Sequence, residues 1–262
     1  MTLTLRARTT FIFGCGASAL LCLASIVVAL AADRSTLWRI VHDICVPDEE
    51  QNHNPAPCTL VDLSGGEARG YVVLKDIVGI TQFLVLPIAR VAGIESPQLI
   101  APDAPNYMQD AWAARRFVEA RAPAPLKRQD LSLAVNSVLG RTQDQLHIHV
   151  DCLRNDVRDA LDKHRGEIGD AWGPFPVPLA GHEYIARRVV AADLSSINPF
   201  RLLAAASPEV RSHMGDYTLV LAGASFAGKP GFILLADHAD PARGDDASGE
   251  SLQDHGCALA RR

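Results

Sequence analysis

Two histidines separated by a single residue lie in the middle of the chain, within the run QLHIHVDC at residues 145–152. In an extended strand, alternate side chains point to the same side of the sheet, so His147, His149 and Asp151 would share one face. Neighbouring members of this row would be about 6.5–7 Å apart, a span comparable with a diphosphate and its attacking nucleophile. Ile148 and Val150 would point the other way and hold the strand against the core. The spacing therefore predicts three ionisable groups on one rigid surface.

The His-x-His pair has other interpretations. Two histidines at positions i and i+2 of a strand suit zinc, provided that a third ligand comes from elsewhere. His182, His213, His238 and His255 are available for that role. The pair would also fit a solvated polar edge of a sheet. Its spacing alone does not separate these interpretations from phosphate chemistry.

The elements that must position this row are mostly short strands. Apolar runs predict strands at residues 71–74, 83–87, 131–136, 145–152, 184–190, 217–222 and 231–236. Helical spacing of apolar residues predicts helices at residues 35–44, 106–121, 156–164 and 199–205. Successive strands are joined by turns rather than by helices, which predicts an α+β domain with a mainly antiparallel sheet.

Three segments are expected to lie outside regular structure. Residues 46–70 are polar and rich in turn-forming residues, so we expect a loop there. Residues 173–178 are rich in proline, which opposes regular strand pairing. Residues 240–250 are rich in Asp, Gly and Ser and are expected to form a mobile loop.

The composition narrows the classes of protein and of partner. The chain has 262 residues, 48% of them hydrophobic, which predicts one globular domain with a sizeable core. Its 25 basic and 30 acidic residues give a formal net charge of −5. No broad basic surface is expected, which argues against a DNA or RNA polymer as a partner. A small nucleotide needs only one or two local cations and is compatible with this charge.

The amino-terminal segment predicts a membrane anchor. Arg6 and Arg8 precede residues 11–32, a run without charged residues, which as a helix would span roughly 33 Å and could cross a hydrocarbon core of about 30 Å. The alternative is a cleaved signal, because residues 29–31 satisfy the small-x-small cleavage pattern, but the apolar run is longer than a usual signal core. We therefore expect residues 1–32 to be an anchor, or an uncleaved signal, and residues 33–262 to be an exported domain. Positive charges stay in the cytoplasm, which predicts a single-pass protein of the bacterial inner membrane with its catalytic domain on the periplasmic side.

Four of the six cysteines lie in the part that is expected to be exported. An even number of cysteines in an oxidising compartment predicts disulfides. Three pairings are open. We favour Cys45 with Cys58 and Cys152 with Cys257, because the first pair closes a short polar loop. Zinc ligation by these cysteines is disfavoured, since no Cys-x-x-Cys spacing occurs.

Several blocks around the histidine pair resemble known proteins. Asn136, Gly140 and Gln143, followed by the His-Ile-His run, are similar to the signature of the histidine-triad superfamily, and residues 71–91 are similar to its first hairpin. More specifically, six blocks in order resemble the CDP-diacylglycerol pyrophosphatase family: CVPDEEQNHNPAPC, GYVVLKD, NSVLGRTQDQLHIHVDC, GHEYIARRV, HMGDY and QDHGC. The resemblance covers residues 37–257 and implies a histidine-triad-like domain.

The resemblance implies a reaction and a set of site residues. The reaction would be hydrolysis of the diphosphate of CDP-diacylglycerol to CMP and phosphatidate through a nucleotidyl-histidine, in phospholipid metabolism. It aligns the nucleophile with His149, whose neutral imidazole could attack phosphorus. His147 would orient the phosphates or its neighbour, and Gln143 would donate a hydrogen bond to the diphosphate. Arg141 and Lys75 are the candidate cations for the diphosphate. No cofactor and no metal are expected.

One position departs from the family pattern. The third histidine of the triad is replaced by Asp151. A carboxylate would repel a diphosphate unless it were protonated or paired, so we expect Asp151 to orient a histidine or to contact Arg141. The expected partners are the lipid-linked nucleotide and the membrane that holds its acyl chains, and the sequence leaves the oligomeric state open. Two alternatives are a zinc-dependent hydrolase that uses the His-x-His pair and a non-enzymatic exported lipid-binding protein.

Overall fold

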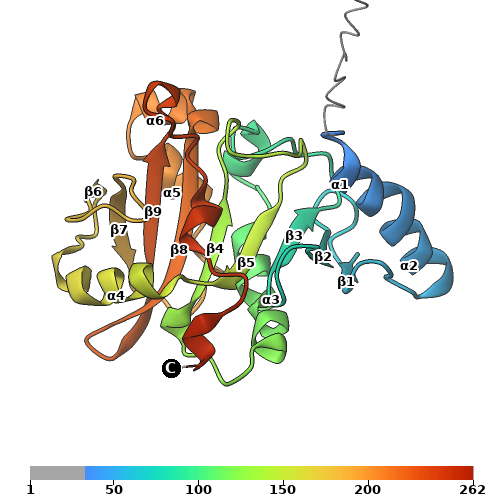
Figure 1. Ribbon diagram of the computed structural model, residues 1–262. Coiled ribbons are helices and arrows are strands. Elements are labelled where there is room, and N and C mark those ends of the chain that lie inside the picture. The colour runs from blue at the N-terminus through green and yellow to red at the C-terminus, as the bar shows by residue number, and fades with distance from the viewer. Residues whose placement is uncertain (1–32, 262) are drawn as a thin grey trace, which may run out of the picture. The chain divides into compact units, whose positions relative to one another are not determined.

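The computed structural model describes residues 33–261 (Figure 1), and the chain from Asp33 onward forms one compact unit. The strands are β1 (Leu60–Asp62), β2 (Tyr71–Lys75), β3 (Phe83–Pro87), β4 (Leu131–Val135), β5 (Ile148–Cys152), β6 (Gly173–Pro174), β7 (Ile185–Val189), β8 (Tyr217–Phe226) and β9 (Lys229–His238). The α-helices are α1 (Thr36–Arg39), α2 (Val46–Asn52), α3 (Tyr107–Arg121), α4 (Asn155–His164), α5 (Pro199–Ala204) and α6 (Pro208–Ser212).

These strands form one sheet. Their order is β1-β2-β3-β5-β4-β8-β9-β7-β6, and every neighbouring pair is antiparallel. Hairpins join β2 to β3 and β8 to β9, as the turn-joined pattern predicts. The α+β class with a mainly antiparallel sheet is confirmed, and the histidine-triad-like assignment stays a prediction.

The apolar runs located most strands, and the differences lie at strand ends and sheet edges. β5 begins at Ile148 rather than at residue 145, because the Gln145 side chain donates hydrogen bonds to carbonyls at the end of β3 and in the following turn. The proline-rich stretch that we expected to lie outside the sheet contributes β6. Proline is tolerated there because β6 is an edge strand. β1, at the other edge, was not predicted.

The first helical region is longer than predicted. α1 continues through a π-helical turn (Ile40–Cys45) into α2, so helical backbone reaches Asn52 instead of ending at residue 44. Pro47 closely follows the π-helical turn, and it has no backbone N–H to donate to the preceding turn of the helix. A disulfide joins Cys45 to Cys58, as favoured from the sequence. The expectation of a loop throughout residues 46–70 is therefore wrong at its beginning.

One face of the sheet packs against α3. Trp112 and Val118 of this helix share a buried cluster with Ile148 and Val150 of β5. Val118, Ile148 and Val150 each contribute about 1.5–3 kcal/mol to the stability of the fold when fully buried. A register slip of one residue would expose them and turn the histidines into the apolar core, so the packing strongly favours the observed register.

The opposite face of β4 and β5 carries the C-terminal segment, which we define as residues 239–261. Figure 1 shows this segment in red beside β4 and β5, and Gln253 donates hydrogen bonds to Ser132 of β4 and to the carbonyl of His149. A disulfide joins Cys257 to Cys152 across 105 residues, which confirms the second favoured pair. In the chain-entropy model, closing a loop of this length stabilises the fold by about 4–5 kcal/mol.

The beginning of the C-terminal segment corrects another expectation. Residues 240–250 were expected to form a mobile loop, but Ala247 and Gly249 are buried and the backbones of Asp240 and Asp245 pair with each other. The polar residues form turns that pack on β4 and β8 instead of extending into solvent. This segment brings residues of the chain's end to the histidine row.

Among residues 33–261, no helix is both long and apolar enough to cross a bilayer. The predicted anchor at residues 11–32 lies outside the described residues.

Candidate active site

β5 lies inside the sheet, between β3 and β4, and this position orients the histidine row. Ile148 and Val150 are fully buried in the cluster with α3, which turns His149 and Asp151 to the opposite face. His147 immediately precedes the strand, and its ring centroid lies 4.9 Å from that of His149. The two rings therefore lie together, as the alternation predicts.

His149 is held by a small polar network. Only 4% of its surface is exposed. Its Nδ1 lies 2.7 Å from Gln82 Nε2 and 3.4 Å from Glu250 Oε1, and the same Gln82 amide donates to Glu250 at 2.8 Å. Its Nε2 is buried and has no hydrogen-bond partner within residues 33–261. A buried nitrogen without a partner is rare in folded proteins, and a catalytic role is one of its recognised explanations.

His147 has a defined tautomer. Its Nδ1 lies 2.7 Å from the carbonyl oxygen of Gln145, and a carbonyl only accepts, so Nδ1 carries the proton. The neutral ring then presents an unprotonated Nε2.

Asp151 is fully buried and orients a histidine. Its carboxylate accepts hydrogen bonds from His255 Nδ1 at 2.8 Å, from Thr81 Oγ1 at 2.7 Å and from the backbone N–H of Cys152 at 2.8 Å. The other ring nitrogen of His255, Nε2, lies 3.4 Å from Glu250 Oε1. Of the two roles expected for Asp151, the structure shows the contact with a histidine.

The three members of the row and the neighbouring His255 all have displaced pKa values. Burial lowers the pKa of His149 well below its ordinary value, and the neighbouring His147 and His255 lower it further. Burial also lowers the pKa of His147. The hydrogen bond to Asp151 raises the pKa of His255, whereas burial raises the pKa of Asp151. Two neutral imidazoles thus lie beside one that holds a proton readily, which is the distribution that a nucleophile and a proton donor need.

Lys75 lies at the edge of this cluster. Its Nζ donates hydrogen bonds to the carbonyls of Asp76 at 2.6 Å and of Gly79 at 3.1 Å, which leaves one ammonium proton for another acceptor. Burial lowers the pKa of Lys75, and the charge of Asp151 opposes this effect. Its predicted role as a diphosphate contact stays a prediction.

Arg141 and Gln143 are engaged elsewhere. The Arg141 guanidinium is buried and bonds Glu95 at 2.6 and 2.8 Å and Asp144 at 3.2 Å. The Gln143 side chain bonds backbone groups at the start of the first helical region. Within residues 33–261, no hydrogen bond or ion pair joins either side chain to the histidine pair. Their assignment to the substrate likewise stays a prediction.

The cluster includes side chains that sequence reasoning did not assign to catalysis. His255 was considered only as a zinc ligand, although it lies in the block QDHGC that carried the resemblance. Gln82 directly precedes β3, within the hairpin that the resemblance covered. Glu250 had no signal in the sequence, because its segment was expected to be mobile.

The zinc interpretation needs a third ligand beside the His-x-His pair. His255 is close, but its Nδ1 is bonded to Asp151. In residues 33–261, ligand atoms with metal-binding spacing gather at a different place, at His182, Asp237 and Asp245. The His-x-His pair does not belong to that group.

The row is covered in this conformation. His147 and His149 are only 7% and 4% exposed, and His149 Nε2 is buried. The side chains that cover it must move to admit a substrate.

Comparisons with known proteins identify the family. A crystal structure of a DUF4931 family protein from Bacillus cereus ATCC 10987 matches 64% of this chain and 81% of its own, with a TM-score of 0.41 and 9% identity, which is too slight a likeness to support an argument. The family model of CDP-diacylglycerol pyrophosphatase matches residues 32–261. Because this is a family of enzymes, the alternative interpretation of the chain as a non-enzymatic lipid-binding protein is wrong. The chain therefore belongs to the CDP-diacylglycerol pyrophosphatase family, whose members are hydrolases that act on an anhydride bond.

Proposed function

We propose that this enzyme hydrolyses CDP-diacylglycerol to CMP and phosphatidate in phospholipid metabolism, and that His149 forms a covalent nucleotidyl intermediate. The observation that carries the mechanism is the buried, unpartnered Nε2 of His149 inside a network of imidazoles and carboxylates. Because burial lowers the pKa of this ring, it stays neutral and nucleophilic at neutral pH.

Attack by Nε2 requires the proton of the neutral ring to be on Nδ1. Two acceptors beside Nδ1 can receive that hydrogen bond. Glu250 Oε1 is 3.4 Å away. The amide oxygen of Gln82 is buried without a partner within residues 33–261, and it would face Nδ1 after a half-turn of the amide; the Glu250 carboxylate, which now accepts from the amide nitrogen, would then turn away from it. We assign Gln82 and Glu250 as positioning residues that select the tautomer of His149.

The first step breaks the diphosphate. Nε2 of His149 bonds to the phosphorus of the cytidylyl group while the bond from that phosphorus to the phosphatidate oxygen breaks. The departing oxygen takes a proton from the His255 imidazolium, whose pKa is raised by its hydrogen bond to Asp151. The His255 imidazolium and the remaining N–H of Lys75 also offset the negative charge of the diphosphate. The carboxylates of Asp151 and Glu250 add negative charge at the same place, so both cations are needed.

The second step releases the nucleotide. Water attacks the phosphorus of the nucleotidyl-histidine, the phosphorus–nitrogen bond breaks, and CMP leaves. The proton of the attacking water passes to His255, which the first step left neutral. Both histidines therefore return to their starting protonation states, and no metal ion takes part in either step.

The intermediate is the direct test. CDP-diacylglycerol that carries a radioactive label in the phosphate next to cytidine is mixed with the full chain and quenched in alkali, where a phosphoramidate survives. Label on the protein, located at His149 by peptide mapping, is the expected result. His147→Gln, which keeps a polar side chain beside the nucleophile, is expected to retain labelling at a slower rate.

Two outcomes would remove the covalent mechanism. One is turnover with inversion of configuration at the labelled phosphorus, because two displacements give retention. The other is undiminished labelling in His149→Ala. Zinc bound to the wild-type chain but lost in His149→Ala, with no label trapped, would instead favour a zinc-dependent hydrolase.

The loop between β2 and β3 supports a membrane surface as the partner. Ile77 is 99% exposed, Val78 48% and Ile80 50%. The loop turns at Gly79, whose φ of 62° suits glycine. The end of the loop next to β3 is hydrogen-bonded to the site, because the backbone N–H of Ile80 donates to the carbonyl of His255 at 3.0 Å. Apolar side chains at the entrance to a lipid-hydrolysing site suit contact with acyl chains, which cannot leave the bilayer without a cost of about 0.8 kcal/mol per methylene.

Substitution of the loop tests this contact. With the chain reconstituted in vesicles, the double variant Ile77→Ser, Ile80→Ser is expected to lower CMP release from vesicle-borne substrate by about tenfold or more. It should retain activity on a water-soluble short-chain substrate. The matched control is Ile44→Ser, since Ile44 is also 48% exposed but lies in the first helical region. Equal losses on both substrates would contradict the assignment.

A further inference from the structure

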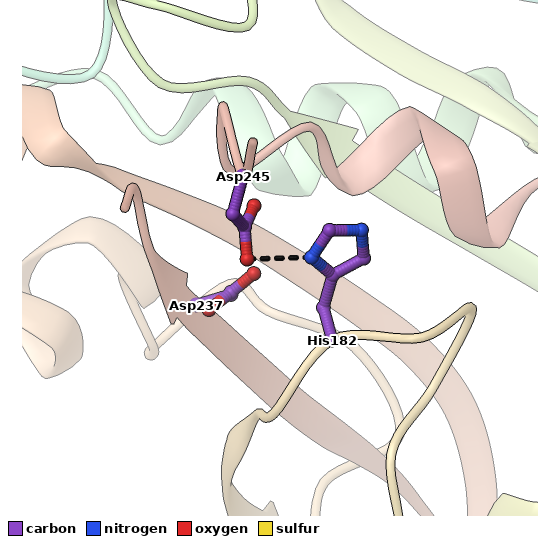
Figure 2. Close-up of side chains that lie close together, drawn as sticks. All are labelled: His182, Asp237 and Asp245. Carbon is purple, nitrogen blue, oxygen red and sulfur yellow. Dashed lines mark hydrogen bonds and ion pairs between the residues drawn. The ribbon is translucent and has the colours of Figure 1, made fainter. Parts of the chain in front are cut away.

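A second cluster of histidine and carboxylate side chains lies apart from the row on β5. His182 lies in the turn before β7, Asp237 near the end of β9, and Asp245 in the C-terminal segment. Figure 2 shows the three side chains directed toward one another from these three elements. Segments that are distant in sequence therefore meet at one point, and none of the steps proposed above uses it.

The geometry of this cluster suits one cation. His182 Nδ1 and Asp245 Oδ2 lie 2.5 Å apart, and one ligand atom from each of the three residues lies within 4.8 Å of the others. Ligand atoms that share a tetrahedral zinc ion are each about 2.0–2.2 Å from it, hence roughly 3.5 Å apart. Small side-chain rotations would bring the three atoms to that separation.

The charge of the cluster calls for a positive partner. Asp237 is only 7% exposed, and within residues 33–261 no lysine or arginine forms an ion pair with it or with Asp245. Two carboxylates held together with one imidazole are stabilised when a cation lies among them.

A separate observation points to a missing ligand. The three side chains line a cavity of about 450 Å³ together with Tyr184. Tyr184 is 3% exposed, and its hydroxyl is buried beside that of Ser251; apart from each other, neither hydroxyl has a hydrogen-bond partner within residues 33–261. Two orphaned hydroxyls beside the carboxylates offer partners for water molecules on a bound ion.

We propose that His182, Asp237 and Asp245 bind one divalent transition-metal ion, with zinc as the best fit, and that the ion ties β9 and the turn before β7 to the C-terminal segment. An imidazole ligand favours zinc or a similar metal over magnesium and calcium, which prefer sets made only of oxygen. Three protein ligands leave a fourth position toward the cavity for water. The ion would act on the C-terminal segment, because Asp245 belongs to the segment that also carries Glu250 and His255.

Zinc binding to the full chain in detergent tests the proposal. The protein is stripped with a chelator and dialysed, and bound zinc is then measured by elemental analysis and the melting temperature by scanning fluorimetry. One zinc per chain and a rise in melting temperature of roughly 5–10 °C at a hundredfold excess over the dissociation constant are expected. Magnesium and calcium should give a much smaller rise.

Variants assign the zinc to these residues. Asp237→Asn and Asp245→Asn should each weaken zinc binding by tenfold or more, because each variant removes one charged ligand. Glu183→Gln is the matched control, because Glu183 lines the same cavity but is not one of the three ligands. Circular dichroism of the stripped proteins verifies folding, and His182→Gln replaces any aspartate variant that fails this check.

Two results would overturn the proposal. One is the absence of zinc binding to the wild-type chain. The other is zinc that is lost in His149→Ala but retained in Asp237→Asn, which would place the metal at the row on β5. Retention in His149→Ala together with loss in Asp237→Asn supports the site proposed here and is independent of whether the hydrolase mechanism holds.

Discussion

Two clusters of histidine and carboxylate side chains differ in one respect that sets their chemistry. The first cluster consists of the row on β5 together with His255 and Glu250, so it holds three histidines and two carboxylates. The rings of His147 and His149 are almost fully buried. In the second cluster, one histidine accompanies two carboxylates beside an open cavity. In both clusters a carboxylate accepts a hydrogen bond from Nδ1 of an imidazole, Asp151 from His255 in the first and Asp245 from His182 in the second.

The ratio of imidazole to carboxylate decides what each cluster can do. Burial, together with two neighbouring imidazoles, lowers the pKa of His149 and leaves a neutral nitrogen for the proposed attack. An excess of carboxylate leaves negative charge that a cation can satisfy. The same residue types therefore predict a nucleophile in one place and a metal ligand set in the other, and substitutions can separate the two.

The largest expected effect is on catalysis at the first cluster. His149→Ala should lower CMP release by roughly 10⁴-fold, because it removes the nucleophile and leaves only binding contributions. His213→Gln, at an exposed histidine bonded to Glu209, is the control and should leave the rate unchanged. An equal loss in Asp237→Asn would erase the distinction between the clusters. Steady-state assays of CMP release provide the measurement.

Asp151→Asn should have the next largest effect. The rate should fall about 10²-fold, since His255 loses the partner that raises its pKa. The pKa of His255 then falls, so the loss of activity at high pH should begin at a lower pH than in the wild type. Asp254→Asn is the control, because the Asp254 carboxylate bonds only backbone N–H groups of the next turn. A pH profile that keeps its alkaline limb in Asp151→Asn would leave Asp151 a purely structural role.

A third prediction concerns stability in acid. The pKa values of His147 and His149 are lowered in the folded state, so below pH about 6.5 the unfolded chain binds protons that the folded chain does not. The contribution of these two histidines to stability is fully present above that pH and is lost as the pH falls below it. Between pH 7.5 and 5.5 the two histidines should lower the free energy of unfolding by about 2–3 kcal/mol.

Urea unfolding at both pH values measures this loss, and His147→Gln should reduce it by about half. His255 opposes this loss in the upper part of the window, because its raised pKa adds stability as the pH falls toward the unfolded value of about 6.5, and it adds no further change below that value. A wild-type chain that is equally stable at both pH values would contradict the burial of neutral imidazoles.

The smallest effect is expected at the second cluster. In chelator at pH 8, Asp237→Asn should raise the melting temperature by about 2–4 °C, because it relieves roughly 1 kcal/mol of repulsion between facing carboxylates. With zinc, the same variant should melt below the wild type, because it lacks a ligand. Scanning fluorimetry under both conditions measures this reversal of sign. A variant that is less stable than the wild type in chelator as well would show that the carboxylate pair is stabilising without a cation.

Local pattern predicted the strands of the sheet better than their ends or edges. Runs such as those of β2, β3 and β4 are long and apolar enough for burial to decide their structure. β1 and β6 are short edge strands whose pairing depends on neighbours across the sheet, which the local pattern does not contain. The polar composition of residues 240–250 indicated exposure, but backbone pairing and the packing of Ala247 decided the outcome.

The site shows the same limit. His147, His149 and Asp151 were found together because a strand repeats every two residues. The contact between Gln82 and Glu250 spans 168 positions, and no periodicity connects residues so far apart. The family resemblance brought in the block that holds His255 but did not assign it a role, and the hydrogen bond to Asp151 supplied one.

The crosslink between Cys152 and Cys257 also sets an order of events in the making of the enzyme. A growing chain that has passed residue 152 already carries His149, the proposed nucleophile, whereas Glu250 and His255 are synthesised about a hundred residues later. Until then the proposed nucleophile lacks the two side chains that we assign to hold it and to supply a proton. Oxidation of Cys152 with Cys257 then joins the strand that carries His149 to the segment that carries these two residues.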